Sequence, residues 1–210
     1  MANLKTYEEL NSLELDTLRE IGSIGTGNAA TALSQLLGRE VRIVLPEVRI
    51  MGDNEAIEWI GGAEEITAEV LVKLGGQVNW IMLAVQQLGF ANMLLESMLG
   101  KTVEDYSGLG EIEGSALVEV GNIMISTFIN AFSSLCDISI DLTVPAFTVD
   151  MQGAILAVPM AESGGQSDYI MTVGGHFVCD NKEIPCRLLL SPDIRSLNFI
   201  LRKLGVDGGQ

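Results

Sequence analysis

An internal repeat constrains the fold of this chain more than any other feature of its sequence. The segment that starts at Leu15 aligns without a gap with the segment that starts at Gly114, at a constant offset of 99 residues. Identical residues in the two copies include Leu18/Leu117, Glu20/Glu119, Gly22/Gly121, Ile24/Ile123, Ala32/Ala131, Leu36/Leu135 and Pro46/Pro145. The chain of 210 residues is therefore predicted to fold into two similar halves related by a pseudo-two-fold axis.

Each copy begins with a long helical pattern, continues with apolar alternating segments and ends with a shorter helical pattern. The apolar segments are residues 66–74 and 78–86 in the first half and 151–160, 168–178 and 184–191 in the second. The shorter helices are predicted at 88–100 and at the end of the chain, where Ser191 is the expected N-cap, Pro192 the first position and Gly205 the stop.

Short strands joined by tight turns favour antiparallel pairing over a doubly wound parallel sheet. We therefore expect an α+β fold, internally duplicated, in which two long helices pack on a mainly antiparallel sheet. The expected organisation is a single domain over residues 1–210, built from repeats at approximately 10–100 and 109–205.

The glycines at positions 22, 25 and 27, in the stretch REIGSIGTGN, are compatible with a phosphate-binding loop or with a closely packed helix. A dinucleotide-type phosphate loop follows a strand and opens a helix, whereas residues 11–20 already have helical period and composition. We therefore interpret the glycines, with Ala29 and Ala30, as small residues that let another backbone or a partner surface approach. The cost to helix propensity is up to about 1 kcal/mol per glycine.

The two long helices each combine an apolar stripe with an opposite polar face. The stripes predicted to lie in the core are Leu18, Ile21, Gly25, Ala29, Ala32 and Leu36 in the first copy and Leu117, Val120, Met124, Phe128, Ala131 and Leu135 in the second. The polar faces are Asp16, Glu20, Ser23, Gly27, Thr31 and Ser34, and Ser115, Glu119, Asn122, Ser126, Asn130 and Ser133. Two interpretations stay open: a flat surface kept for a partner, or twin helices hydrogen-bonded to each other through these residues.

The formal net charge of −16 excludes some classes of partner. It would repel a phosphate backbone, so nucleic acid is not an expected partner, and it would favour a protein with a basic patch. No apolar run approaches the roughly 18 residues of a membrane helix, and the N-terminus lacks the basic-then-apolar order of a signal peptide. We expect a cytoplasmic protein without membrane insertion.

The three cysteines do not predict a metal site. Cys136, Cys179 and Cys186 have no CxxC spacing, and His176 is the only histidine. Reduced thiols in the core or in strands are the expected state.

A motif with fixed spacing lies in the second copy and consists of Ser115, Glu119, Asn122 and, after twenty-two intervening residues, Pro145. It resembles the signature of the CheC, CheX and FliY phosphatases of bacterial chemotaxis, which begins with Asp or Ser and continues with Glu, Asn and Pro. The likeness covers essentially the whole chain, and the two tandem copies are similar to the CheC type. The first copy has Asp16, Glu20 and Pro46 in register, but Ser23 in place of the asparagine.

The resemblance implies hydrolysis of the aspartyl phosphate on the response regulator CheY. By the same resemblance, the Asn122 amide aims the attacking water, and Glu119, one turn earlier, forms a salt bridge with the active-site lysine of CheY. Mg²⁺ would be supplied by CheY, so the chain is expected to have no cofactor of its own.

The two copies are not expected to contribute equally. The Glu119/Asn122 site should carry most of the activity, and the Glu20/Ser23 site should be weak or serve docking, since a serine hydroxyl has a shorter reach. We expect Asp16 and Ser115 to support the motif. Pro46 and Pro145 are expected to end or bend an edge strand.

An alternative function is that of a non-catalytic adaptor for phosphorylated CheY, the flagellar switch or the receptor deamidase CheD. The flagellar switch protein FliM has a middle domain of similar fold without the catalytic pairs, so this architecture can serve binding alone. Proteins of the CheC type also bind CheD, which is therefore a second candidate partner.

Overall fold

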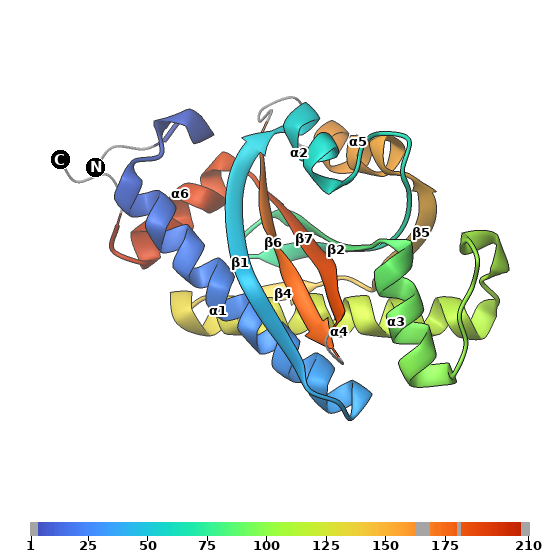
Figure 1. The fold of residues 1–210 in the computed structure, drawn as a ribbon. Helices are drawn as coiled ribbons and strands as arrows, with labels where there is room; N and C mark the ends of the chain where they lie inside the picture. Colours follow the sequence, from blue (N-terminus) through green and yellow to red (C-terminus); the bar gives the residue numbers. More distant parts are fainter. Residues whose placement is uncertain (1–3, 163–168, 180–181, 207–210) are drawn as a thin grey trace.

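The computed structural model describes residues 4–162, 169–179 and 182–206, and its elements form three layers with a sheet in the middle (Figure 1). The sheet has seven strands in the order β1-β6-β7-β3-β2-β4, with β5 also paired to β2. All of the described pairings are antiparallel. The expected α+β fold with a mainly antiparallel sheet is confirmed.

The elements follow one another in two similar series. The first half contains the 3₁₀ turn η1 (Tyr7–Glu9), α1 (Ser12–Leu37), β1 (Val41–Gly52), α2 (Asp53–Ile60), β2 (Ile66–Gly76), β3 (Trp80–Gln86) and α3 (Leu88–Leu99). The second half contains η2 (Tyr106–Gly108), α4 (Glu111–Cys136), β4 (Ile140–Leu142), β5 (Ala146–Met151), α5 (Gln152–Glu162), β6 (Tyr169–Cys179), β7 (Lys182–Pro192) and α6 (Ile194–Lys203).

The order of the strands shows the predicted pseudo-two-fold symmetry. β3 and β7 pair at the centre, β2 and β6 flank them, and β1 lies at one edge while β4 and β5 lie at the other. The edge strands are exchanged, because β1 of the first half pairs with β6 of the second, and β4 and β5 of the second half pair with β2 of the first.

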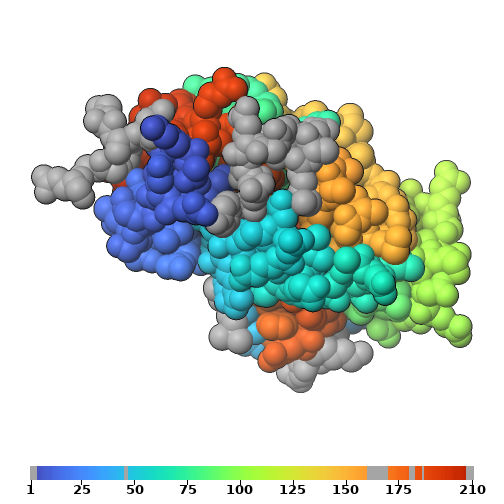
Figure 2. All heavy atoms as spheres, turned by 90° about the horizontal axis from the view of Figure 1, so that it is seen from above, coloured from blue at the N-terminus to red at the C-terminus, as the bar shows by residue number. Residues whose placement is uncertain are grey.

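The helices cover both faces of the sheet. α1, α3, α4 and α6 contribute to the larger apolar core on one face, and α2 and α5 form a smaller core on the other. Seen from above, α2 and α5 lie side by side (Figure 2). The long helices of the two motifs therefore share one layer, in which α1 and α4 are in contact.

Residues 151–160 were expected to form a strand, and this prediction is wrong. They form β5's last residue and most of α5, whose buried residues Gln152, Ile155, Leu156 and Pro159 recur at helical spacing. A short apolar run does not separate a strand from a buried helix by periodicity alone. α5 is the repeat equivalent of α2, which begins 99 residues earlier at Asp53 and was not anticipated.

The start of the last helix also differs from the prediction. Ser191 and Pro192 are the final residues of β7, and the N-cap is Asp193, whose Oδ1 accepts a hydrogen bond from the Ser196 amide at 2.7 Å. Proline lacks an amide hydrogen, so it is tolerated at the last position of a strand as well as at the first of a helix. Gly205 has a left-handed φ of +72° just after the helix, as a stop residue should.

α1 is a continuous helix through Gly22, Gly25 and Gly27, which excludes a phosphate-binding loop there. Two of these three glycines allow close packing. A Cβ on Gly22 would lie 2.4 Å from Val48 Cγ2 of β1, and a Cβ on Gly25 would lie 2.4 Å from Phe128 Cδ2 of α4. Gly27 has no atom within 4 Å of such a Cβ. Gly22 and Gly25 therefore serve packing, and Gly27 lies on the open face.

The predicted core stripes are correct over most of the two long helices and wrong at their C-terminal ends. Leu36 and Leu135, which are repeat equivalents, are 37% and 45% exposed, whereas Leu33 and Phe132 are buried in their place. The face of each helix that contacts the core changes along its length because α1 and α4 cross each other over the sheet (Figure 1).

By length and composition alone, α4 could also cross a membrane. Half of its apolar stretch is buried inside the fold, and the core helix of a soluble protein passes the same test.

Candidate functional site

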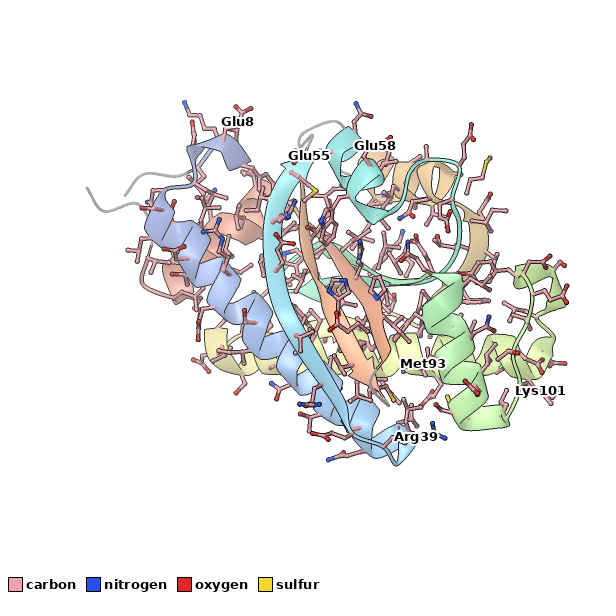
Figure 3. All side chains as sticks on the ribbon, in the orientation of Figure 1. Glu8, Arg39, Glu55, Glu58, Met93 and Lys101 are labelled. Carbon is pink, nitrogen blue, oxygen red and sulfur yellow. The ribbon has the colours of Figure 1, made fainter. Side chains whose placement is uncertain are left out.

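The second motif lies in the first half of α4, and the start of this helix is firmly held. Glu113 Oε2 accepts a hydrogen bond from the amide of Gly110, the N-cap, at 3.1 Å, and its Oε1 lies 3.0 Å from Nζ of Lys101. The hydrogen bond from Lys101 is the main cause that lowers the pKa of Glu113 below its usual value. Lys101 lies just beyond the end of α3 (Figure 3). The position of the motif is thus tied to α3.

The motif residues of α4 lie on one outward face. Ser115 and Glu119 are exposed and Asn122 is half-buried, at spacings of four and three residues that place them one above another. In the part of the chain that the structure describes, neither the Glu119 carboxylate nor the Asn122 side-chain amide has a hydrogen-bond partner. Ser126 donates instead to the backbone oxygen of Asn122, at 2.7 Å. The chemical groups of the motif are free to contact another molecule.

An open groove of about 550 Å³ runs beside this face. Its lining includes Ser115, Val118 and Glu119 of α4 and Phe147 of β5. The groove carries the carboxylates of Glu111 and Glu119 among small and apolar residues, and its open shape suits a protein contact better than a closed small-molecule site.

The first motif lies on α1 in a similar position but with different chemistry. Glu20 is exposed and Ser23 is half-buried, while the Asp16 carboxylate pairs with Arg19 at 2.8 Å. Asp16 and Glu20 line an open groove of about 410 Å³, together with Leu135 of α4. Ser23 presents a short hydroxyl where Asn122 presents an amide.

The two polar faces have the same exposure at every matched position. The pairs Asp16/Ser115, Glu20/Glu119 and Thr31/Asn130 are exposed, and the pairs Ser23/Asn122, Gly27/Ser126 and Ser34/Ser133 are half-buried. The two helices do not hydrogen-bond to each other through these faces in the described structure, and their contact runs through Gly25 and Phe128 instead. The twin-helix interpretation is therefore wrong.

Two residues of these faces have a structural role. Ser34 Oγ accepts a hydrogen bond from the amide of Val41 at 2.9 Å, and its repeat equivalent Ser133 donates to the carbonyl of Ile138. Both serines join the end of a long helix to the segment that leads into the next strand. The hydroxyls of these two serines are thus used within the fold and are not part of a surface for a partner.

The prolines of the motifs lie at interruptions of the edge strands. β1 changes register between Val44 and Glu47, around Pro46, whose side chain lies outside the described part of the structure. Pro145 lies between β4 and β5. Proline cannot donate to a ladder, so both positions agree with a role in bending an edge strand.

Two of the three cysteines are buried in the fold, and His176 is half-buried. Cys136 and Cys179 are buried and form no disulfide within the described residues, and burial raises the pKa of the Cys136 thiol to about 11. The side chain of Cys186 lies outside the described residues. Among the side chains that the structure describes, no group of three or more His, Cys, Asp or Glu could hold a metal ion.

Sequence reasoning missed three residues that support the long helices. Gln86, the last residue of β3, donates a side-chain hydrogen bond to α4, and Tyr106 and Tyr7 donate to the carbonyls that end β3 and β7. The signal was available, because Tyr7 and Tyr106 keep the repeat offset of 99 residues. Extending the alignment upstream of Leu15 would have found the tyrosines.

Comparison with known proteins agrees with this repeat. The model of the CheC-like family matches residues 13–48 and 112–149, which contain the two motifs. The protein named CheY-P phosphatase CheC from Bacillus subtilis is 25% identical over 206 residues, which span 96% of this chain and 99% of that protein. The chain is similar to the CheC-like family in both copies of its repeat. The suspected resemblance is confirmed.

Solved structures resemble this CheC-like chain along most of its length. FliY from Thermotoga maritima has a TM-score of 0.72 at 21% identity and covers 95% of this chain and 100% of the FliY chain. The FliM middle domain from H. pylori has a TM-score of 0.68 at 13% identity, with 92% and 99% coverage. CheX from Borrelia burgdorferi, in a complex with CheY, BeF₃ and Mg²⁺, has a TM-score of 0.52 at 16% identity, with 83% and 96% coverage. At these identities the structures support the fold.

Proposed function

We propose that this chain is a phosphatase that hydrolyses the aspartyl phosphate of the chemotaxis response regulator CheY. The observation that carries the proposal is the pair Glu119 and Asn122, one helical turn apart, without internal hydrogen-bond partners, on an outward face of α4. The similarity to CheC of Bacillus subtilis over nearly the whole of both chains supports it, as does the fold shared with a CheX that was solved with CheY.

In the proposed reaction, Asn122 positions the water. Its amide has both a donor and an acceptor, so it can hold a water in line with the phosphorus atom. The water oxygen forms a bond to phosphorus as the bond from phosphorus to the aspartate oxygen breaks, and inorganic phosphate leaves. Hydrolysis of this kind requires little covalent work from the protein and depends on positioning.

Glu119 is proposed to anchor CheY. Its exposed carboxylate is placed to pair with a lysine beside the phosphorylation site, and a chain with net charge −16 would attract such a basic partner. We assign Mg²⁺ to CheY, because α4 presents one carboxylate in the motif and the described residues form no metal-binding cluster. When bound there, Mg²⁺ would neutralise charge on the phosphoryl group.

The experiment follows the loss of phosphate from pre-phosphorylated CheY of the same organism in the presence of Mg²⁺. Wild type should accelerate the loss, and Asn122→Ala should remove about two to three decades of that acceleration, as the loss of a positioning group typically does. Ser23→Ala is the matched control and should keep most of the activity. An equal loss in both variants would contradict the ranking of the two sites.

A second candidate is a binding module without catalysis. The likeness in fold to the FliM middle domain and the absence of the asparagine at Ser23 favour it. It would be supported if wild type bound phosphorylated CheY without accelerating loss of phosphate. Binding to CheD stays a prediction.

A further inference from the structure

Gln86 connects the centre of the sheet to the turn of α4 that carries the motif. The side chain is fully buried, and its Nε2 donates to the backbone oxygen of Leu117 at 2.9 Å. Leu117 lies between Ser115 and Glu119. The hydrogen bond therefore acts on the part of the helix whose position decides where Glu119 and Asn122 point.

Gly121 makes this contact possible. A Cβ at this position would lie 3.1 Å from Nε2 of Gln86 and 2.5 Å from Cγ2 of Val70. The absence of a side chain lets the backbone of α4 approach the end of β3 closely. Asn122 is the next residue, so a close approach of helix and sheet lies directly beside the proposed water-positioning group.

Tyr106 holds Gln86 from its backbone side. The tyrosine belongs to η2, just before α4, and its hydroxyl donates to the Gln86 carbonyl at 2.5 Å. Burial raises the pKa of Tyr106 to about 12, so the hydroxyl keeps its proton near neutral pH. Gln86 is thus fixed between η2 and α4.

In the described structure α1, the long helix of the first half, lacks this connection. Tyr7, the repeat equivalent of Tyr106, donates to the carbonyl of Pro192, which ends β7 as Gln86 ends β3. Proline has no side-chain donor, so no equivalent bond reaches α1. The long helix with the complete Glu/Asn pair is the one that a buried glutamine supports.

We propose that Gln86 is a positioning residue that holds the turn of α4 between Ser115 and Asn122 in place for catalysis. It acts through the Leu117 backbone and does not touch the substrate. The proposal rests on the proposed phosphatase function. A displacement of catalytic groups by about 1 Å can lower the rate by as much as about 100-fold. The loss of one buried hydrogen bond under the motif is therefore expected to lower the rate of hydrolysis.

The test compares Gln86→Leu with Asn198→Leu in phosphatase assays on phosphorylated CheY at a temperature where both variants are folded. Asn198 is also a buried amide, but it bonds to the backbone of Leu4 on the far side from the motif. Gln86→Leu should lower kcat about ten-fold with KM changed less than about two-fold, because orientation and not docking is lost. Asn198→Leu should lower the melting temperature but keep kcat.

A second arm separates positioning from general destabilisation. If Gln86 acts through Asn122, Gln86→Leu should have no further effect in an Asn122→Ala background. Unchanged kcat in Gln86→Leu, or the same ten-fold loss in the Asn122→Ala background, would overturn the proposal.

Amide hydrogen exchange provides a readout that does not need activity. Gln86→Leu should speed exchange in peptides from residues 115–125 of α4 and leave residues 16–26 of α1 unchanged. If wild type has no phosphatase activity, the proposed function and the catalytic role of Gln86 both fall. Faster exchange in α4 would then still show that Gln86 holds the helix.

Discussion

The ring of Phe128 in α4 occupies the space beside Gly25 of α1 where a side chain would otherwise lie. A Cβ on Gly25 would come within 2.4 Å of Cδ2 and 2.5 Å of Cε2 of this ring. The two long helices therefore meet through their core sides near their middles. This arrangement leaves both motif faces directed outward.

Gly25 and Gly27, two residues apart in α1, should respond oppositely to alanine. Gly25→Ala should lower the free energy of unfolding by about 1–3 kcal/mol, because the new methyl group overlaps the Phe128 ring. Gly27→Ala should raise it by up to about 1 kcal/mol, because nothing lies within 4 Å and alanine is the better helix former. Urea unfolding of both variants checks this. Similar changes at both positions would mean that the α1–α4 contact is misplaced.

Ser23→Asn should create a second working site. Glu20 and Ser23 have the same exposure as Glu119 and Asn122, so an asparagine at position 23 would present its amide on an equivalent surface. The substitution should restore phosphatase activity to an Asn122→Ala chain and at most roughly double the rate of wild type, since it completes one additional site. Phosphate release from phosphorylated CheY measures both effects.

The control for this gain is Thr31→Asn, which adds the same side chain further along the polar face of α1. It should give no rescue. If Ser23→Asn also gives none, the site on α1 lacks something other than the amide, and the absence of a contact like that of Gln86 with α4 is the first feature to examine.

Glu119→Gln should weaken the complex with phosphorylated CheY. Removal of one charged pair worth about 1 kcal/mol corresponds to roughly five-fold weaker binding. The affinity of the variant should also depend less on salt concentration than the affinity of wild type. Fluorescence anisotropy at two ionic strengths measures this. Glu55→Gln removes the same charge from α2, on the opposite side of the sheet, where the side chain points outward (Figure 3). Equal losses in the two variants would indicate a general charge effect.

Glu69 should make the stability of the protein depend on pH. Burial raises its pKa from 4.5 to about 7, and the Thr67 hydroxyl, which donates to Oε1 at 3.1 Å, offsets part of that rise. The folded chain therefore binds more protons than the unfolded chain between these values, and the free energy of unfolding should fall as pH rises from about 4.5 to 7.

Glu69→Gln should remove that slope. The variant should be more stable than wild type at pH 8 by on the order of 3 kcal/mol and close to it at pH 4. Urea unfolding at the two pH values measures the difference. Glu58→Gln, at an exposed position of α2, should leave the slope unchanged. A wild-type slope of opposite sign would contradict the burial of a protonated Glu69.

The repeat and the motif could be found from the sequence because both depend on regular spacing. The offset that joins Glu20 to Glu119 predicts two equivalent halves, and the positions of Ser115, Glu119 and Asn122 on one helix face follow from the helical period. The same rules correctly excluded a phosphate loop at Gly22, because the helical pattern begins before it. Local periodicity was less informative at residues 151–160, where an apolar run in a buried position suits a strand or a helix.

The sequence by itself determined the duplication, the antiparallel α+β class and the polar face of each long helix, with the asymmetry between Asn122 and Ser23, because these are properties of spacing along the chain. Only the tertiary structure decided which residues support that face. The contact of Gln86 with Leu117 joins segments 31 residues apart, and the packing of Gly25 on Phe128 joins the two halves. Such contacts depend on how the helices cross the sheet, and the pattern within either segment does not encode the angle at which they meet.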